Sequence, residues 1–181
     1  MRSAEEVHQF WFVDHTFEDW FGSDPEFDTL VDTEFRTTFD GIVQGHGWTW
    51  RTTPRGRLAE IIVLDQFSRQ FHRGTHFAFA YDTIALVLAQ EMVAQGLDQA
   101  LSTAERTFAY LPYMHSESLI IHEAAAHLYA DLGDEDALAF ENGHLETLKR
   151  FGRYPKRNEA LGRQSTPEEL AYIAETEDRM F

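Results

Sequence analysis

The sequence predicts an all-α protein of stacked antiparallel helix pairs, with residues 1–181 forming a single helical domain. Apolar residues recur three and four positions apart along most of the chain, which is the spacing of one helix face. Alternation of apolar and polar residues, the mark of a strand, never extends over more than a few positions. Glycine, proline and polar capping residues divide the chain into segments of about 12–20 residues, and helices of that length joined by short turns pack in antiparallel pairs.

The N-terminal segments follow this pattern. An apolar stripe predicts a helix over residues 4–21, and a glycine ends it. Ser23 or Asp24 then caps a second helix over residues 25–40, with a proline in its first turn. Residues 45–56 contain two tryptophans and a proline without helical periodicity, so we expect an ordered loop there.

The middle of the chain contains the most apolar segments. Residues 57–71 are apolar nearly all round, which predicts a central buried helix. Residues 75–95 form a longer helix that a glycine ends. A further helix covers residues 97–110 and stops before Pro112, because proline disfavours continuation of a helix through it.

The C-terminal part has the clearest helix boundaries. We expect a helix over residues 115–132 with Gly133 as its C-terminal cap, and then a helix from Asp134, its N-cap, to about residue 151. Residues 165–169 read Ser-Thr-Pro-Glu-Glu. This string is a strong helix start, since a hydroxyl cap and a proline precede carboxylates that favour the positive end of the helix dipole.

The composition constrains partners and location. The chain has 31 acidic and 15 basic residues, a net charge of −16, so it repels polyanions and general nucleic-acid binding is disfavoured. It has no cysteine, which excludes disulfides, thiolate catalysis and cysteine-ligated metals. No secretory signal is recognisable and no apolar run approaches the roughly 18–20 residues of a membrane span. We therefore expect a cytoplasmic protein without a membrane partner.

A polar cluster lies within the most apolar predicted helix. Asp65, Arg69 and Arg73 are spaced four apart, so they lie along one helix face, and Gln66 is adjacent. A buried ion pair is costly unless its geometry and hydrogen bonding are good. Either Asp65 and Arg69 form an internal pair that fixes helix packing, or one arginine binds an anionic ligand through its planar guanidinium.

The basic residues are concentrated near the C-terminus. Residues 149–163 hold six of the 15 basic residues, and a glycine and a proline shape the turn that carries them. Three interpretations are open. The basic side chains complete the dipole of a helix end and bind acidic helices within the protein, they form a pocket for a carboxylate or phosphate, or they dock an acidic protein. Under the pocket interpretation Arg153, Arg157 and Asn158 are candidate ligand-binding residues.

His115 and Glu117 are the candidate catalytic residues. A histidine in a partly buried cleft acts as a general base at neutral pH, whereas a structural histidine binds a backbone carbonyl or a carboxylate. The string from His122 to His127 looks like a zinc-protease motif, but its histidines are five positions apart rather than four. Five positions turn a helix by about 500°, which leaves the rings about 140° apart. The sequence therefore nominates no metal site and no cofactor.

Three stretches together resemble a known family: LDQFSRQFHRG at residues 64–74, LPYMHSE at 111–117, and RFGRYPKRNEALGR with STPEE between 150 and 169. In this order and spacing they are similar to the bacterial family of unknown function called DUF924, over nearly the whole chain. The matching residues are Asp65, Gln66, Arg69, Arg73, Pro112, His115, Ser116, Glu117, His144, Arg150, Gly152, Arg153, Pro155, Arg157, Asn158 and Arg163. The resemblance implies a tetratricopeptide-like superhelix or bundle, and it brings no reaction or substrate.

This chain departs from the family pattern at two positions. The family usually has an acidic residue where Ser118 stands and a glutamine where His122 stands, so roles that need those side chains do not transfer.

Taken together, these motifs predict a binding or enzymatic pocket for an anionic small molecule. Its catalytic residues would be His115 and Glu117. Its ligand-binding residues would be Asp65, Gln66, Arg69, Arg73, Arg153, Arg157 and Asn158. One alternative is a scaffold that binds a protein partner in a tetratricopeptide-like groove. A second is a buried polar network that fixes the fold.

Overall fold

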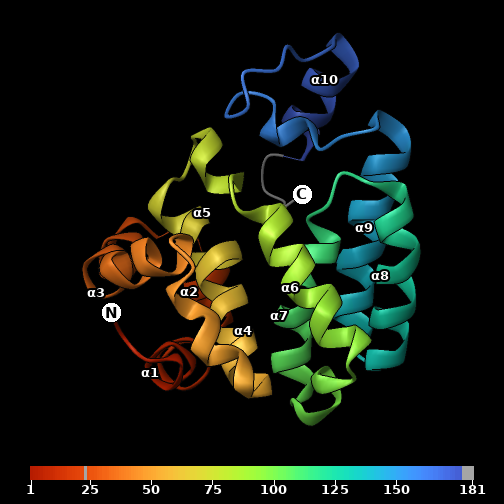
Figure 1. The fold of residues 1–181 in the computed structure, drawn as a ribbon. Coiled ribbons are helices and arrows are strands. Elements are labelled where there is room, and N and C mark those ends of the chain that lie inside the picture. The colour runs from red at the N-terminus through yellow and green to blue at the C-terminus, as the bar shows by residue number, and fades with distance from the viewer. Residues whose placement is uncertain (23, 177–181) are drawn as a thin grey trace.

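The computed structural model describes residues 1–22 and 24–176, and every regular element in these ranges is helical. This confirms the all-α prediction. The α-helices are α1 (Ala4–Gln9), α2 (Phe17–Phe21), α3 (Pro25–Val43), α4 (Pro54–Ile62), α5 (Ser68–Phe71), α6 (Asp82–Ala94), α7 (Thr103–Met114), α8 (Leu119–Leu132), α9 (Glu135–Phe151) and α10 (Pro167–Glu175). In Figure 1, α1–α5 form one group, α6–α9 form a second, and α10 lies at one end.

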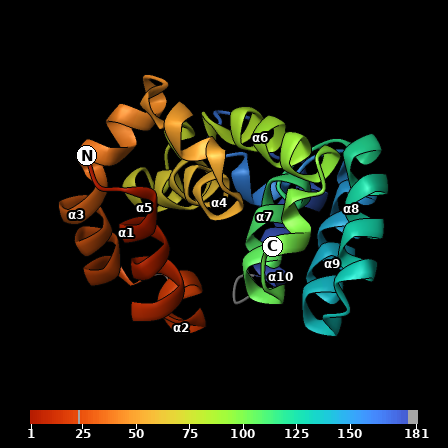
Figure 2. The same ribbon diagram turned by 60° about the horizontal axis from the view of Figure 1, so that its bottom comes forward.

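The helices of the second group are neighbours in the sequence and in space. Helix α7 contacts α6 and α8, and α8 contacts α9. Figures 1 and 2 show α7, α8 and α9 side by side, with the chain reversing direction at each short connection. In the first group, α1 packs on α4 and α3 packs on α5. Helix α4 also contacts α6 and α7, so it joins the two groups.

The predicted helix over residues 4–21 is interrupted. Helix α1 continues into a π-helical turn, Phe10–Asp14, and the chain is extended at His15 and Thr16 before α2 begins. Two local interactions stabilise the break. The His15 ring bonds the Phe10 carbonyl through Nδ1 at 2.8 Å, and Thr16 forms a capping box with Asp19.

Several predicted helix ends are confirmed. Asp24 caps α3 by accepting a hydrogen bond from the Glu26 N–H at 2.9 Å, while the alternative cap, Ser23, lies outside the described residues. Gly133 ends α8 with a φ of +73°, a left-handed conformation that glycine adopts without steric cost. Thr166 and Glu169 form the expected capping box at the start of α10.

Other boundaries differ from the predictions. Residues 46–52 of the expected loop form a 3-10 turn, His46–Thr52. The expected helix over residues 75–95 is divided into a 3-10 turn, His76–Phe79, and α6. The expected helix over residues 97–110 begins instead with a 3-10 turn, Leu97–Ala100. Ser102 then caps α7 in a capping box with Glu105.

Pro112 lies inside α7 rather than beyond it, so the predicted stop at residue 110 is wrong. Proline in the last turn removes only one intrahelical hydrogen bond, and the helix continues to Met114. His115–Ser118 then forms the connection to α8, which begins at Leu119 rather than at His115. His115 consequently lies on a turn between two helices.

The predicted central helix is confirmed, with one unexpected feature. The chain is helical without interruption from Pro54 to Phe71, but the middle, Val63–Phe67, is a π-helical turn. Val63–Ser68 is fully buried or nearly so. Trp11, also fully buried, packs edge-on against Phe67 with ring centroids 5.4 Å apart. Aromatic packing therefore fixes the N-terminal helices against the central one.

One segment, His76–Ala94, has the length and apolar composition of a membrane span, with 28% of its most apolar window buried. The prediction that no run approaches that length was therefore too strong. The core helices of globular proteins pass the same test, and α6 buries Ala85, Leu88, Ala89 and Met92 in the interior.

Two tryptophans provide a test of this packing. Trp11→Ala removes a fully buried ring, and we expect a loss of about 3–5 kcal/mol in the free energy of unfolding, measured by urea denaturation. Trp48, 68% exposed, is the matched control, and Trp48→Ala should change that free energy by less than about 0.5 kcal/mol. Equal losses from the two variants would contradict the assignment of the core.

Candidate functional site

A cavity of about 690 Å³ lies between α2, the end of the central helix, α7 and α9. One part of its wall is apolar and mostly aromatic: Phe17, Trp20, Phe21, Ala104, Phe108, Leu111, Met114, Ala137 and Phe140. The polar part is formed by Gln66, Arg69, Gln70, Arg73, Thr107, His115, Asp134, Asp136 and His144. Apolar and polar residues contribute equally to the lining, and a cavity of this volume with convergent polar groups has the size of a small-molecule site.

A smaller cavity of about 210 Å³ adjoins the large one. Arg69, His115 and His144 line both cavities and so form a shared wall where the two meet. The remaining lining residues of the small cavity are Phe79, Thr147, Tyr154, Pro155, Lys156, Arg157 and Tyr172.

Asp65 orients two of the residues in this wall. Its side chain is only 1% exposed, and its Oδ1 lies 2.8 Å from Nδ1 of His115 and 3.3 Å from Nη1 of Arg69. The Gln66 amide donates to the other oxygen, Oδ2, at 2.5 Å. Both carboxylate oxygens are therefore hydrogen-bonded or ion-paired, as a buried charge requires.

These contacts determine the protonation states. Burial opposes the charged form of Asp65, but Arg69 and His115 outweigh it and hold the pKa of that carboxyl below its usual range. Burial lowers the pKa of His115, and the nearby Arg69 lowers it further against the charge of Asp65. His115 is therefore a neutral imidazole at physiological pH, paired with an ionised carboxylate.

Arg69 and Arg157 share a second carboxylate, that of Asp82 at the start of α6. Arg69 binds Asp82 through two hydrogen bonds of 2.9 and 3.0 Å, the bidentate geometry that guanidinium favours. Arg157 reaches the same carboxylate with Nη1 alone, at 3.4 Å. Its guanidinium lies over the rings of Phe79 and Tyr154, 4.8 and 4.7 Å from their centroids.

The structure brings together six of the predicted site residues, five of which line a cavity. Gln66, Arg69, Arg73 and His115 line the large cavity, and Arg157 lines the small one. Asp65 lies behind His115 as its partner. Arg69 and Arg73 are both paired with carboxylates, Arg73 with Asp28 through two hydrogen bonds of 2.7 Å.

Glu117, Arg153 and Asn158 lie outside the described walls of both cavities. The Glu117 carboxylate accepts hydrogen bonds from the Arg163 guanidinium and from the Tyr154 N–H. Burial opposes its ionisation, but these donors lower the pKa of Glu117. Glu117 therefore holds the C-terminal turn in place.

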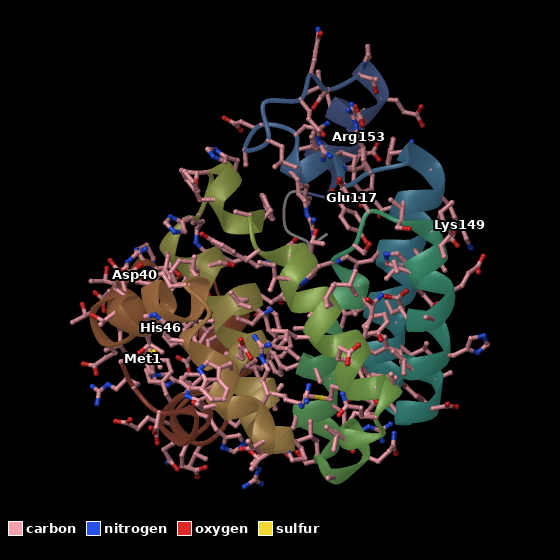
Figure 3. The ribbon with its side chains drawn as sticks, viewed as in Figure 1. Met1, Asp40, His46, Glu117, Lys149 and Arg153 are labelled. Carbon is pink, nitrogen blue, oxygen red and sulfur yellow. The ribbon has the colours of Figure 1, made fainter. Side chains whose placement is uncertain are left out.

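Arg153 and Asn158 belong to the same C-terminal region. Arg153 binds Glu169 at 2.7 and 2.8 Å and so attaches the chain after α9 to α10. The buried Asn158 amide bonds Ser165 and Arg163. Figure 3 places Arg153 and Glu117 close to α10, whereas Lys149 lies on the outer side of α9.

The sequence did not single out Gln70 or the aromatic wall. Gln70 is buried and lines the large cavity, and its Oε1 has no hydrogen-bond partner within residues 1–22 and 24–176. Gln70 follows Gln66 by four positions on an apolar helix, and this spacing could have placed it on the same helix face. Phe17, Trp20 and Phe21 have the spacing of one helix face. Core rings and rings that line a cavity share this spacing, so the sequence could not show that these three line a cavity.

The string that imitates a zinc motif has another role. His122 is fully buried, where its Nδ1 lies 2.6 Å from Glu141 and its Nε2 lies 2.8 Å from the Tyr154 hydroxyl. His127 is exposed on another side of α8. Among the described residues, no cluster of three or more His, Asp or Glu side chains is arranged to hold a metal ion.

Comparison with known proteins establishes the family. The family model described as "Bacterial protein of unknown function (DUF924)" matches residues 7–177. The chain belongs to this family. A solved protein of unknown function from Agrobacterium tumefaciens, ATU0120, is 34% identical, with a TM-score of 0.89, and the alignment covers 95% of this chain and 97% of that one. No curated protein matches the sequence.

The charge network predicts unequal roles for two arginines. Arg69→Ala leaves the buried Asp65 without its main cation, and we expect a loss of about 3–5 kcal/mol in the free energy of unfolding. The Arg73 side chain is 47% exposed, so Arg73→Ala should cost no more than about 1 kcal/mol. Urea denaturation of both variants measures the difference, and a similar cost for each would refute the network.

His144 gives the protein a specific pH dependence. Burial lowers the pKa of His144 to about 3, whereas an unfolded histidine titrates near ~6.5. Burial of neutral His144 contributes fully to the free energy of unfolding at a pH above the pKa of histidine in the unfolded chain. As the pH falls from there towards the pKa of His144 in the folded protein, the free energy of unfolding decreases by up to about 1.4 kcal/mol per pH unit. Urea denaturation from pH 7 to pH 4 should therefore show a shallower loss in His144→Asn than in the unmodified protein.

The control for this prediction is His127→Asn, which replaces an exposed histidine of α8. It should retain the pH dependence of the unmodified protein. If His144→Asn retained it as well, burial of a neutral His144 would not be its source.

Proposed function

We propose that this protein binds a small molecule with an anionic group in the adjoining cavities, and that His115 acts on it as a general base. The observation that carries the proposal is the pairing of His115 with the buried Asp65 in the wall that both cavities share. A carboxylate that orients an imidazole beside a ligand cavity is a recurrent arrangement for proton transfer.

The pair is suited to accept a proton. With the Nδ1–H of His115 donated to Asp65, the neutral ring keeps a lone pair on Nε2. A proton taken from a ligand, or from a water beside it, converts the ring to imidazolium. The negative charge of Asp65 stabilises that form, and Asp65 itself stays ionised. The lowered pKa of His115 keeps the accepting form populated at neutral pH.

A buried hydrogen-bond acceptor without a partner lies beside the large cavity. Oε1 of Gln70 is buried and has no partner in the described part of the chain, although other atoms of Gln70 line the cavity. A buried acceptor without a partner costs about 1–3 kcal/mol. This oxygen has almost no accessible surface, so a ligand N–H or O–H group would reach it only if the Gln70 side chain turned toward the cavity.

A scaffold with a tetratricopeptide-like groove is the second candidate. Leu119 and Ile120 at the start of α8, 47% and 76% exposed, are the observation that favours a protein partner. A cytoplasmic location suits both candidates, because neither needs a membrane or a disulfide.

A thermal-shift screen against sugar phosphates, nucleotides and small carboxylates tests binding. A ligand at about 100 times its Kd stabilises by ~2.7 kcal/mol, which for a chain of this size raises the midpoint by about 5–10 °C. Arg153→Ala is the matched control, since Arg153 lies outside both cavities, and it should keep the shift. If no compound shifts the unmodified protein, the proposed pocket is wrong.

The base is tested with a compound that binds. We expect conversion of that compound, or exchange of its protons for deuterium in D₂O, followed by proton NMR. His115→Asn should slow this step by about 100-fold or more while the compound still binds. An undiminished rate in that variant would exclude His115 as the base.

A further inference from the structure

We propose that the ligand is an aromatic anion, whose carboxylate or phosphate lies beside Arg157 in the small cavity and whose ring lies in the large cavity. This inference rests on the proposed function, and it adds the chemical class of the ligand and its direction in the site.

Basic side chains line the small cavity. Arg69, Lys156 and Arg157 line it, and none of its described lining residues is acidic, in a chain whose net charge is −16. Two hydroxyl groups also line it, those of Thr147 and Tyr172, which lie 2.9 Å apart. A volume of about 210 Å³ is sufficient for a carboxylate or a phosphate.

Arg157 is held less closely by Asp82 than Arg69 is. Its side chain is only 14% exposed, and its contact with Asp82 is a single one of 3.4 Å on a carboxylate that Arg69 already holds with two shorter bonds. Burial lowers the pKa of Arg157, and the neighbouring Arg69 lowers it further. An anion that accepts hydrogen bonds from its guanidinium edge would supply the missing negative charge.

The large cavity is suited to a ring. Trp20 packs edge-on against Phe108 at 4.8 Å, and Phe21 stacks on Phe108 at 6.1 Å, so a continuous aromatic surface lines one wall. The half-exposed Phe17 extends that surface. Aromatic side chains bind a ligand ring by stacked or edge-to-face contact over such distances.

The residues that line both cavities determine which part of the ligand lies between its ring and its anionic group. A molecule with its ring in the large cavity and its anion in the small one passes the residues that line both, Arg69, His115 and His144. The atoms that link ring and anion then lie beside His115. The polarity of the two cavities thus places the reacting part of the ligand next to the base.

Four probes test the class of ligand by isothermal titration calorimetry on the unmodified protein at pH 7: 3-phenylpropionate, phenyl phosphate, 3-phenylpropan-1-ol and propionate. We expect one or both aromatic anions to bind at least about tenfold more tightly than the alcohol and than propionate. Equal binding of the alcohol and the acid would overturn the inference, as would equal binding of propionate and the acid.

Variants locate the two ends of the ligand. Arg157→Gln should weaken binding of the aromatic anion at least about tenfold and leave the alcohol unchanged. Lys149→Gln makes the same charge change at an exposed residue outside both cavities and should leave both affinities unchanged. Phe17→Ala, at a half-exposed ring, should weaken the acid and the alcohol alike, by about two- to tenfold.

The outcomes separate this inference from the proposed function. If the thermal-shift screen finds a ligand whose affinity Arg157→Gln does not alter, the assignment of the anion is wrong and the pocket stands. If no compound of either set binds, both fail. Should Arg157→Gln not fold, intermolecular NOEs from the probe ring to Trp20 and Phe108 in the unmodified protein decide the orientation, and their absence with a bound probe overturns it.

Discussion

Asp65 carries a negative charge at a point from which water is excluded, and the cations and donors that balance it come from separate segments. Arg69 lies one turn further along the same helix, and His115 lies on the connection between α7 and α8. Through Arg69 the network continues to Asp82 at the start of α6, and from there to Arg157 after α9. Apolar contacts tolerate small displacements, whereas hydrogen bonds to a buried charge do not. One carboxylate thus ties together the central helix, the α7–α8 connection, the start of α6 and the turn after α9.

Much of the fold could be predicted from local signals. The caps at Asp24, Gly133 and Thr166 are confirmed because a cap satisfies backbone groups within one turn, so the residues that determine it are adjacent in the sequence. The break before α2 and the two π-helical turns were missed, since tertiary packing as well as local sequence determines them. Pro112 was misjudged for a simpler reason: it lies where a helix can lose one hydrogen bond and still continue.

The candidate site was only partly predictable. Asp65 and Arg69 could be identified because they are polar residues in an otherwise apolar helix. Asp82, the partner of Arg69, could not, because nothing in the sequence distinguishes it from the other acidic residues among the 31. Glu117 and Arg153 were chosen for charge, and the structure shows each in an ion pair that holds the C-terminal region, with Arg163 and with Glu169. Three of the six basic residues in the stretch, Arg150, Arg153 and Arg163, are paired in this way, as the internal alternative expected. Arg157 has a single contact with a carboxylate, at 3.4 Å.

The π-helical turn at Val63–Phe67 has a consequence for how the site is encoded. Its wider hydrogen-bonding pattern accommodates one residue more than an α-helix would. The side chains after the turn therefore point in other directions around the helix axis than they would in a continuous α-helix. Removing a single residue there would restore regular geometry and rotate Arg69 by about 100° relative to the helix before the turn. Every motif residue would remain in the sequence, and the wall that both cavities share would lose its arginine. In this helix, therefore, the number of residues specifies the site as much as their identities do.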